Sequence, residues 1–297
     1  MCKLFIFTPT YNRLKNLVKL YESLKNQTYK EFIWLIVDDG STDNTESYVR
    51  QLQSKNVFDI VYLKKENGGK HTAYNLALDY MGSDGWHMVV DSDDWLANTA
   101  VENIFNDISL LQDSKLGVVY PRYSLTEKLR WLPKEVTDVN IPDIKLKYGV
   151  SVETAILIRN SFIGNIRFPI FEGEKFLSEE IFYIELAKIG SFEVSSSKIY
   201  YYEYLQSGLT KNIFRLWLKN PKGVFLLLKK RDDYINRKLS GIRRIVESIK
   251  VALNKDALAM SLPKFRYKLR GFKSAILLPL STLVYLKRFR KFVKINK

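Results

Sequence analysis

Hydrophobic and polar positions follow two different patterns through the first 120 residues of the chain. Four short apolar runs, each of a length typical of buried strands, lie at residues 4–7, 32–37, 58–63 and 88–90. Between these runs apolar residues recur every three or four positions, as at Leu14, Leu17 and Tyr21, which predicts amphipathic helices. Because strands alternate with helices, we expect an α/β fold with a mostly parallel sheet and helices on both of its faces.

The pattern is less regular in the next part of the chain. Further strands are expected at residues 118–120, 152–158 and 199–204. A helix is expected after Ser178, a suitable N-cap residue, with Ile181 and Ile184 on its inner face. The stretch 121–150 contains prolines 121, 133 and 142, and its periodicity is too weak to place elements in it.

Charge divides the chain into two parts. Residues 1–205 hold 23 Lys and Arg against 28 Asp and Glu, whereas residues 206–297 hold 24 against 4. Because its basic residues alternate with Leu, Ile and Phe, the second part is predicted to be helical and amphipathic and to bind an anionic membrane surface. An apolar stretch of 12 residues at 275–286 is shorter than the roughly 20 needed to span a bilayer. A solvated helical bundle packed on the first part is the alternative.

Polar clusters follow the predicted strands at 8–13, 38–43 and 91–94. The carboxyl ends of neighbouring parallel strands meet at one edge of a sheet, so we expect these clusters to converge. In the last of them Asp91, Asp93 and Asp94 would repel one another unless a cation neutralises them, which suits Mg²⁺ or Mn²⁺. A solvated acidic loop that precedes a helix is the alternative.

Four motifs together resemble glycosyltransferase family 2. They are FTPTYN at 7–12, VDDGSTD at 37–43, NGGK at 67–70 and the DXD-type DSDD at 91–94, and the resemblance covers residues 3–205. It implies a GT-A catalytic domain at 1–205, with a Rossmann-like mixed sheet flanked by helices, followed by the basic helical region at 206–297. It also implies an inverting transfer from a nucleotide-diphospho-sugar with a divalent metal ion. The stretches 173–180 and 202–210 resemble a bacterial subgroup that builds capsules and other surface polysaccharides.

The resemblance assigns roles to individual residues. It implies that the nucleotide-sugar is bound by Thr8, Pro9, Tyr11, Arg13, Asp38, Asp39, Asn67, Gly69, Lys70, Asp91, Ser92 and Asp93. Asp93 is the first candidate for the metal, with Asp91 nearer the ribose and donor sugar and Asp94 as a competing ligand. Asp39 is favoured for a hydrogen bond to a uracil-like base. For Asp38, a turn-forming role before Gly40 is the alternative.

An inverting transfer also needs a carboxylate that takes the proton of the acceptor hydroxyl. The family carries a Glu-Asp pair eleven residues before a glycine, and counting back from Gly190 leads to Glu179. Glu179 is therefore the first candidate for the base and Glu180 the second, although glutamate replaces the usual aspartate. Alternatively, both acids only interact with the dipole of the following helix.

These features predict an enzyme that transfers a sugar, most simply from a UDP-sugar, to a hydroxyl of a lipid-linked glycan. It would work in the cytoplasm, peripherally on the inner face of the cell membrane. A single cysteine, Cys2, excludes a disulfide framework and agrees with this location. A sugar-phosphate nucleotidyltransferase is one alternative, and a nucleic-acid-binding protein that uses its basic tail is another.

Overall fold

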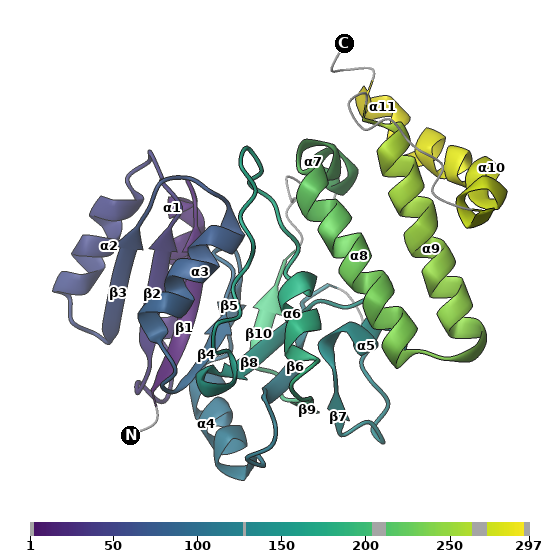
Figure 1. The fold of residues 1–297 in the computed structure, drawn as a ribbon. Helices are drawn as coiled ribbons and strands as arrows, with labels where there is room; N and C mark the ends of the chain where they lie inside the picture. The colour runs from purple at the N-terminus through teal and green to yellow at the C-terminus, as the bar shows by residue number, and fades with distance from the viewer. Residues whose placement is uncertain (1–2, 127–128, 204–211, 263–271, 294–297) are drawn as a thin grey trace. The chain divides into compact units, whose positions relative to one another are not determined.

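The computed structural model describes residues 3–126, 129–203, 212–262 and 272–293 (Figure 1). The chain divides into two compact units. The first consists of residues 1–169 and 185–204, and the second of residues 170–184 and 205–297. The second unit therefore contains the predicted basic region together with an earlier segment, and one boundary between the units falls inside helix α6 (Glu180–Leu186).

The first half of the sheet is parallel and forms as predicted. Its strands lie in the order β3-β2-β1-β4. Their bounds are β1 Leu4–Thr10, β2 Ile33–Asp38, β3 Asp59–Lys64 and β4 Trp86–Val89. Because β1 lies at the centre, the loops after β1, β2 and β4 emerge at neighbouring positions along the same edge.

Helices cover both faces of this sheet because side chains alternate along the strands. Leu4 and Ile6 face a core formed with α1 (Leu14–Lys25), α2 (Thr45–Ser54) and α4 (Ala100–Leu110). Phe5 and Phe7 lie on the other face, where their rings meet Tyr80 and Tyr74 of α3 (Lys70–Met81). The alternation of large apolar residues on both faces explains why strand 4–7 reads as a continuous apolar run.

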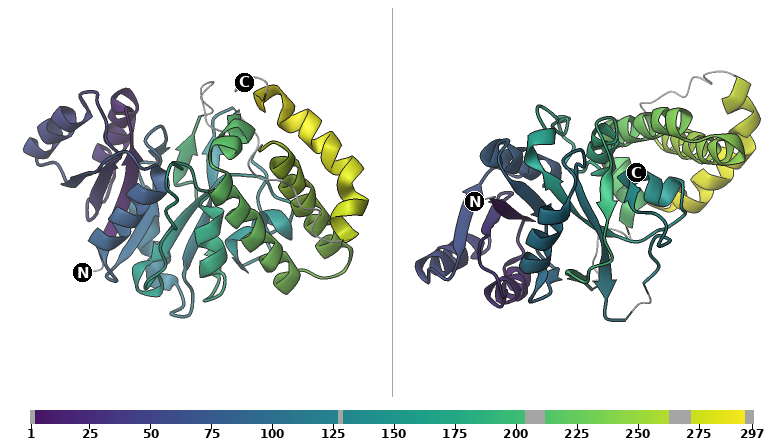
Figure 2. Two further views of the ribbon diagram at one scale, coloured as in Figure 1. Left: turned by 45° about the horizontal axis from the view of Figure 1, so that its top comes forward. Right: turned by 90° about the horizontal axis from the view of Figure 1, so that it is seen from below.

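The second half of the sheet is mixed and twisted (Figure 2). The order continues from β4 as β8-β6-β10-β5, with β8 antiparallel to both β4 and β6. The bounds are β5 Trp95–Leu96, β6 Gly117–Ser124, β8 Thr154–Arg159 and β10 Tyr200–Tyr202. Two short strands, β7 Asp138–Val139 and β9 Phe192–Val194, pair beside β6. At Gly117 a Cβ atom would lie 1.8 Å from the carbonyl oxygen of Leu157, so only glycine lets β6 and β8 approach here.

The structure also shows the elements of the stretch 121–150, which the sequence pattern does not place. Strand β6 continues through Pro121 to Ser124, and the stretch also holds β7 and the helix α5 (Ile141–Leu146). A 3-10 turn at Asn160–Phe162 follows β8. The strand predicted at 199–204 is present as β10, and Tyr204 lies outside the described residues.

The second unit is helical where it is described. It contains the start of α6, then α7 Ile213–Lys219, α8 Pro221–Lys238, α9 Gly241–Met260, α10 Phe272–Arg288 and α11 Arg290–Val293. Helix α8 buries Val224, Leu227 and Ile235, and α9 packs against both α8 and α10. Among the described helices, none is both long enough and apolar enough to cross a bilayer.

Candidate active site

The four motifs identified in the sequence are connected by hydrogen bonds. Asn12, which adopts a left-handed conformation, accepts a hydrogen bond at Oδ1 from the backbone N–H of Thr42 (2.8 Å). The Asp39 carboxylate accepts hydrogen bonds from the backbone N–H groups of Gly68 (2.9 Å) and Gly69 (2.7 Å). The first motif is thus joined to the second, and the second to the third.

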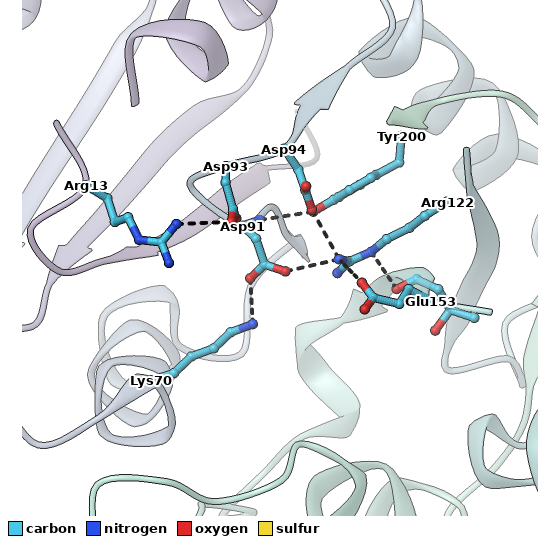
Figure 3. A network of polar contacts seen from close by, with 9 residues as sticks. Arg13, Lys70, Asp91, Asp93, Asp94, Arg122, Glu153 and Tyr200 are labelled. Carbon is cyan, nitrogen blue, oxygen red and sulfur yellow. Dashed lines mark hydrogen bonds and ion pairs between the residues drawn. The ribbon is translucent and has the colours of Figure 1, made fainter. Parts of the chain in front are cut away.

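Two ion pairs complete the connection at the acidic motif (Figure 3). Lys70 Nζ lies 2.6 Å from Asp91 Oδ1, and Arg13 Nη1 lies 3.2 Å from Asp93 Oδ2. With Arg13, which directly follows the first motif, the four motifs therefore form a closed ring of contacts at the carboxyl ends of the strands. The predicted convergence of the polar clusters is present in the structure.

A buried arginine from β6 neutralises the acids. Arg122 Nη1 lies 3.0 Å from Asp91 Oδ2 and 3.2 Å from both Asp94 Oδ2 and Glu153 Oε2, and Nε donates to the carbonyl of Thr154 (Figure 3). Only 9% of the Arg122 side chain is exposed. The like charges of the acidic motif are thus compensated by the protein itself, which was not foreseen from the sequence.

Tyr200 of β10 fixes the same acids from another side. Its hydroxyl donates to Asp94 Oδ2 (2.7 Å) and accepts from the backbone N–H of Asp91 (3.0 Å). The guanidinium carbon of Arg122 lies 4.4 Å from the centre of the Tyr200 ring, a cation–π distance. Tyr200 of β10 and Arg122 of β6 are paired neighbours in the sheet. Two strands of the second half of the sheet therefore hold the acidic motif 91–94, which follows β4 of the first half.

The electrostatic environment distinguishes two of the acids. Burial raises the pKa of Asp91, but Lys70 and Arg122 oppose it and hold the pKa well below the usual range. Burial raises the pKa of Asp94 to about 7, against the attraction of Arg122 and with the repulsion of Asp91. Asp91 is therefore the acid that stays ionised, whereas Asp94 is the acid on which a proton is most easily held.

Asp93 is the acid whose surroundings fit a metal ion. The described part of the chain contains no group of three or more His, Cys, Asp and Glu placed to hold one. Asp91 and Asp94 are engaged by Lys70, Arg122 and Tyr200. The Asp93 side chain is 29% exposed, and its Oδ1 makes no hydrogen bond or ion pair to the described residues. Mg²⁺ is often held by one carboxylate together with substrate phosphates, and Asp93 fits that arrangement.

The other predicted donor-binding residues differ in accessibility. Tyr11 is 47% exposed, Pro9 and Asn67 are half-buried, and Ser92 is buried. The Thr8 hydroxyl is fully buried and accepts a hydrogen bond from the indole N–H of Trp34 (3.0 Å), so the Thr8 side chain belongs to the core.

The two aspartates after β2 have different partners. Asp38 accepts hydrogen bonds from the backbone N–H of Ser41 (2.7 Å) and from the hydroxyl of Tyr62 (2.5 Å). The turn-forming role left open for Asp38 is therefore present. Asp39 is buried and, besides the two glycine N–H groups, pairs with Lys65 at 2.8 Å. Asp39 holds the glycine turn that precedes Lys70, and Gly69 adopts a φ of 96° there, which favours glycine.

The predicted acceptor-side acids belong to the second unit. Glu180 is the first residue of α6, and its backbone N–H donates to Ser178 Oγ (3.3 Å). Ser178 thus contributes to the start of the helix as predicted. Arg231 of α8 donates to both carboxylate oxygens of Glu180, with Nε 2.5 Å from Oε1. Arg231, like Arg122 and Tyr200, was missed in the sequence because its partner lies far away along the chain.

Comparisons with solved structures identify the fold. A structure of Staphylococcus aureus TarS 1–349 in complex with UDP-GlcNAc matches with a TM-score of 0.58 at 19% identity, over 97% of this chain and 89% of TarS. The mannosyltransferase PcManGT from Pyrobaculum calidifontis, in complex with GDP-Man and Mn²⁺, matches with a TM-score of 0.55 at 15% identity, over 98% of this chain and 83% of PcManGT. The predicted GT-A fold is confirmed by these similarities.

Sequence comparison identifies the family. The chain is 24% identical to the Escherichia coli UDP-Glc:alpha-D-GlcNAc-diphosphoundecaprenol beta-1,3-glucosyltransferase WfgD, over 85% of this chain and 94% of WfgD. It spans 17% of the length of Streptococcus pneumoniae GlyA and 62% of the length of S. aureus TarP, two further relatives that it matches. The family model described as glycosyl transferase family 2 matches residues 5–169, which include all four motifs. The chain belongs to glycosyl transferase family 2.

Proposed function

We propose that the protein transfers a sugar from a nucleotide-diphospho-sugar to a hydroxyl of a lipid-linked glycan during the synthesis of a bacterial surface polysaccharide. The observation that carries this proposal is the closed ring of the four motifs, which gathers Arg13, Lys70 and Asp93 at one edge of the sheet. The name of WfgD supports a lipid-diphosphate acceptor and a UDP-sugar donor. The family match favours this reaction over the nucleotidyltransferase and nucleic-acid-binding alternatives.

The donor would be held by groups of opposite charge to its diphosphate. Lys70 lies at the start of α3 and Arg13 just before α1, and both are partly exposed. A helix N-terminus and a lysine side chain together bind phosphate well. Asp39 is proposed for the N3–H of a uracil base, and Tyr11 for packing against that base. The UDP-GlcNAc bound to TarS supports a uridine nucleotide.

Asp93 would hold a divalent metal ion, Mn²⁺ or Mg²⁺, together with the diphosphate. When bound, such an ion supplies Lewis-acid stabilisation of the negative charge on the departing nucleotide. The Mn²⁺ in the PcManGT structure supports this assignment. Asp91 and Asp94 shape the site through Arg122 and Tyr200, and Asp91 would orient the ribose and donor sugar.

Glu179 is proposed as the base, with Glu180 as second candidate. In an inverting transfer the acceptor oxygen attacks the anomeric carbon as the bond to the diphosphate breaks. The acceptor proton passes to the carboxylate in the same step. Replacing the carboxylate by an amide removes this proton acceptor but keeps the shape of the side chain.

The C-terminal helices are proposed to bind the inner, anionic face of the cell membrane. Four apolar residues of α9 repeat at helical spacing and are exposed: Ile242, Ile245, Val246 and Ile249. Exposed Arg243, Arg244 and Lys250 lie on the same helix. Apolar side chains beside basic ones favour the interface of an anionic leaflet, where each basic residue adds about 1 kcal/mol.

The transfer is tested with a panel of nucleotide sugars and a lipid-diphosphate acceptor, with Mn²⁺, Mg²⁺ or a chelator. We expect turnover of a UDP-sugar that the chelator abolishes. Asp93→Ala should lower turnover roughly 100-fold or more and weaken Mn²⁺ binding measured by electron paramagnetic resonance. Asp113→Ala, which removes an exposed acid, is the control. Full activity of Asp93→Ala in chelator would exclude the metal role.

The base is tested with Glu179→Gln and Glu180→Gln. We expect Glu179→Gln to abolish transfer while UDP binding stays near the wild-type value. If Glu180→Gln alone has this effect, the base is Glu180.

Membrane binding is tested by flotation with vesicles of anionic or zwitterionic lipid. We expect binding to anionic vesicles, and its loss in Ile245→Asp. Leu110→Asp, at an exposed leucine of α4 in the first unit, is the matched control and should still float. Equal flotation of both variants would contradict a role of α9.

A further inference from the structure

We infer that helix α8 is the support of the acceptor-side acids, and that Arg231 is a positioning residue that acts through Glu180. This inference rests on the proposed function, because it assumes that the Glu179–Glu180 pair serves the acceptor. The basic C-terminal region would then have a part in the transfer itself, separate from any contact with a membrane. Three groups of contacts inside the second unit carry the inference.

The first contact is the ion pair at the start of α6. Arg231 donates from Nε to Glu180 Oε1 (2.5 Å) and from Nη2 to Glu180 Oε2. This two-bond arrangement fixes the plane of the carboxylate as well as its position, which a lysine could not do. The two side chains are only 19% and 25% exposed, so water screens the pair weakly.

The Arg231 guanidinium is also kept charged by its surroundings. Burial lowers the pKa of Arg231, but the Glu180 carboxylate, assisted by Glu247 of α9, raises it by more. Arg231 therefore stays positively charged at ordinary pH.

The second group of contacts lies at the other end of the segment 174–180, which leads into α6. Glu174 accepts hydrogen bonds from the backbone N–H groups of Lys222 (2.7 Å) and Gly223 (2.8 Å) in the first turn of α8. In return, Asn220 Oδ1 accepts from the backbone N–H groups of Lys175 (2.8 Å) and Phe176 (3.0 Å). A side chain of the segment thus accepts from backbone donors of α8, and the side chain of Asn220 accepts from backbone donors of the segment. Breaking these hydrogen bonds would leave buried and partly buried N–H groups without a partner, which costs free energy.

The third contact is steric. A Cβ atom at Gly223 would lie 2.8 Å from Cδ1 of Leu177, so the Leu177 side chain packs directly against the backbone of α8. Leu177 itself is buried. Because Gly223 has no side chain, the Leu177 side chain and the Phe176 carbonyl oxygen can both pack close to the backbone of α8.

Together these contacts hold the segment at two places along one rigid element. Positions 223 and 231 are separated by about 12 Å along the axis of α8, at 1.5 Å per residue. Glu179 lies in the sequence between the two anchors, next to the residue that Arg231 binds. A carboxylate held to within a fraction of an ångström reacts faster, and a shift of about 1 Å can cost roughly 100-fold in rate. Release of the Arg231 anchor should therefore lower kcat and leave donor binding unchanged.

The test compares Arg231→Met, Arg231→Lys and Arg237→Met in the full chain. Arg237 lies on the same helix and is exposed, so Arg237→Met controls for the loss of one positive charge. We expect kcat to fall roughly 10- to 100-fold in Arg231→Met, less in Arg231→Lys and not at all in Arg237→Met, with the Kd for UDP unchanged in all three. A kcat of Arg231→Met within twofold of the wild type would overturn the inference.

A second measurement separates positioning from folding. In a Glu180→Gln background, Arg231→Met should change the remaining kcat by less than twofold, because the residue acts through Glu180. Fully multiplicative effects would overturn this role. If Arg231→Met does not fold, Arg231→Ala with added methylguanidinium replaces it; recovery of kcat supports the inference and its absence, in a folded protein, refutes it.

Hydrogen exchange of residues 174–184 distinguishes the two proposals. Faster exchange in Arg231→Met than in Arg237→Met shows that Arg231 holds the segment. If this occurs in a protein whose wild type transfers no sugar, the proposed function fails while the anchoring by α8 stands. If the wild type transfers sugar and exchange is equal in the two variants, the inference about Arg231 fails alone.

Discussion

Replacing Arg122 by methionine would remove the guanidinium that Asp91, Asp94 and Glu153 share. Methionine fills much of the same space and keeps the apolar part of the side chain. The change therefore tests the charge and the hydrogen bonds of Arg122 more than its volume. It leaves Lys70 on Asp91 and the Tyr200 hydroxyl on Asp94.

The size of the effect follows from burial. Arg122 is 9% exposed and Asp94 7%, so their ion pair is shielded from water. Removing one partner of a buried pair costs about 3–5 kcal/mol, because the other charge stays buried without compensation. Asp91 retains Lys70, and Asp94 can take up a proton, since its pKa is already raised to about 7. We therefore expect the lower end of the range, about 3 kcal/mol in the free energy of unfolding of the first unit.

Thermal unfolding is the suitable measurement. For a unit of this size about 3 kcal/mol corresponds to a fall of roughly 6–12 °C in Tm. Arg50→Met is the matched control, because Arg50 is 67% exposed and water screens its pair with Glu46 on α2. The Tm of Arg50→Met should therefore stay within about 2 °C of the wild type.

A second variant tests the electrostatic reason. Adding Asp94→Asn to Arg122→Met removes the uncompensated charge while the amide oxygen can still accept the Tyr200 hydroxyl. The double variant should be more stable than Arg122→Met alone. If Arg122→Met lowers Tm no more than Arg50→Met does, or if Asp94→Asn lowers it further, the reasoning about this network is wrong.

Three further changes test other parts of the first unit. His87 is fully buried between Tyr74 and Asn160, and burial lowers its pKa from 6.5 to about 4. Between these pH values the unfolded state binds more protons than the folded state, so the free energy of unfolding should fall by up to about 3 kcal/mol as the pH drops from 6.5 to 4. In thermal melts at several pH values, His87→Asn should flatten this dependence. Tyr200→Phe removes two hydrogen bonds at the acidic motif and should cost about 1–3 kcal/mol in urea unfolding. Gly117→Ala should cost more than Tyr200→Phe in the same measurement, because its Cβ would collide with the backbone of β8.

The sequence predicted those parts of the fold that depend on local periodicity. The parallel strands, the helices between them and the convergence of the loops at one edge follow from apolar runs and from the geometry of a parallel sheet. The acids at 91–94 were identified because three carboxylates in four residues are conspicuous in the chain itself. The resemblance of the four motifs led correctly to glycosyl transferase family 2.

The partners of these acids could not be predicted in the same way. Arg122 lies in a stretch with prolines, 28 residues beyond Asp94, and only the pairing of β6 with β10 brings it beside Tyr200. An arginine next to the apolar run 117–121 was the available signal, since a buried strand seldom carries a charge without a partner. The attachment of residues 174–180 to α8 likewise depends on contacts about 45–50 residues apart in the chain, which no local pattern encodes.

The arrangement of charges suggests how the free protein would accommodate the proposed diphosphate donor. Arg13 and Lys70, the cations proposed to bind this diphosphate, each pair with an acid of the motif 91–94. If either cation moves to the diphosphate, the carboxylate that it paired with loses its positive partner. The loss is greater for Asp93 than for Asp91, because Asp93 has no buried arginine beside it among the described residues. Asp91 keeps Arg122 in this exchange. The same ion pairs that stabilise the empty site would therefore make binding of the donor and of a divalent ion mutually favourable, and Arg13→Met should weaken UDP binding less in chelator than in Mn²⁺.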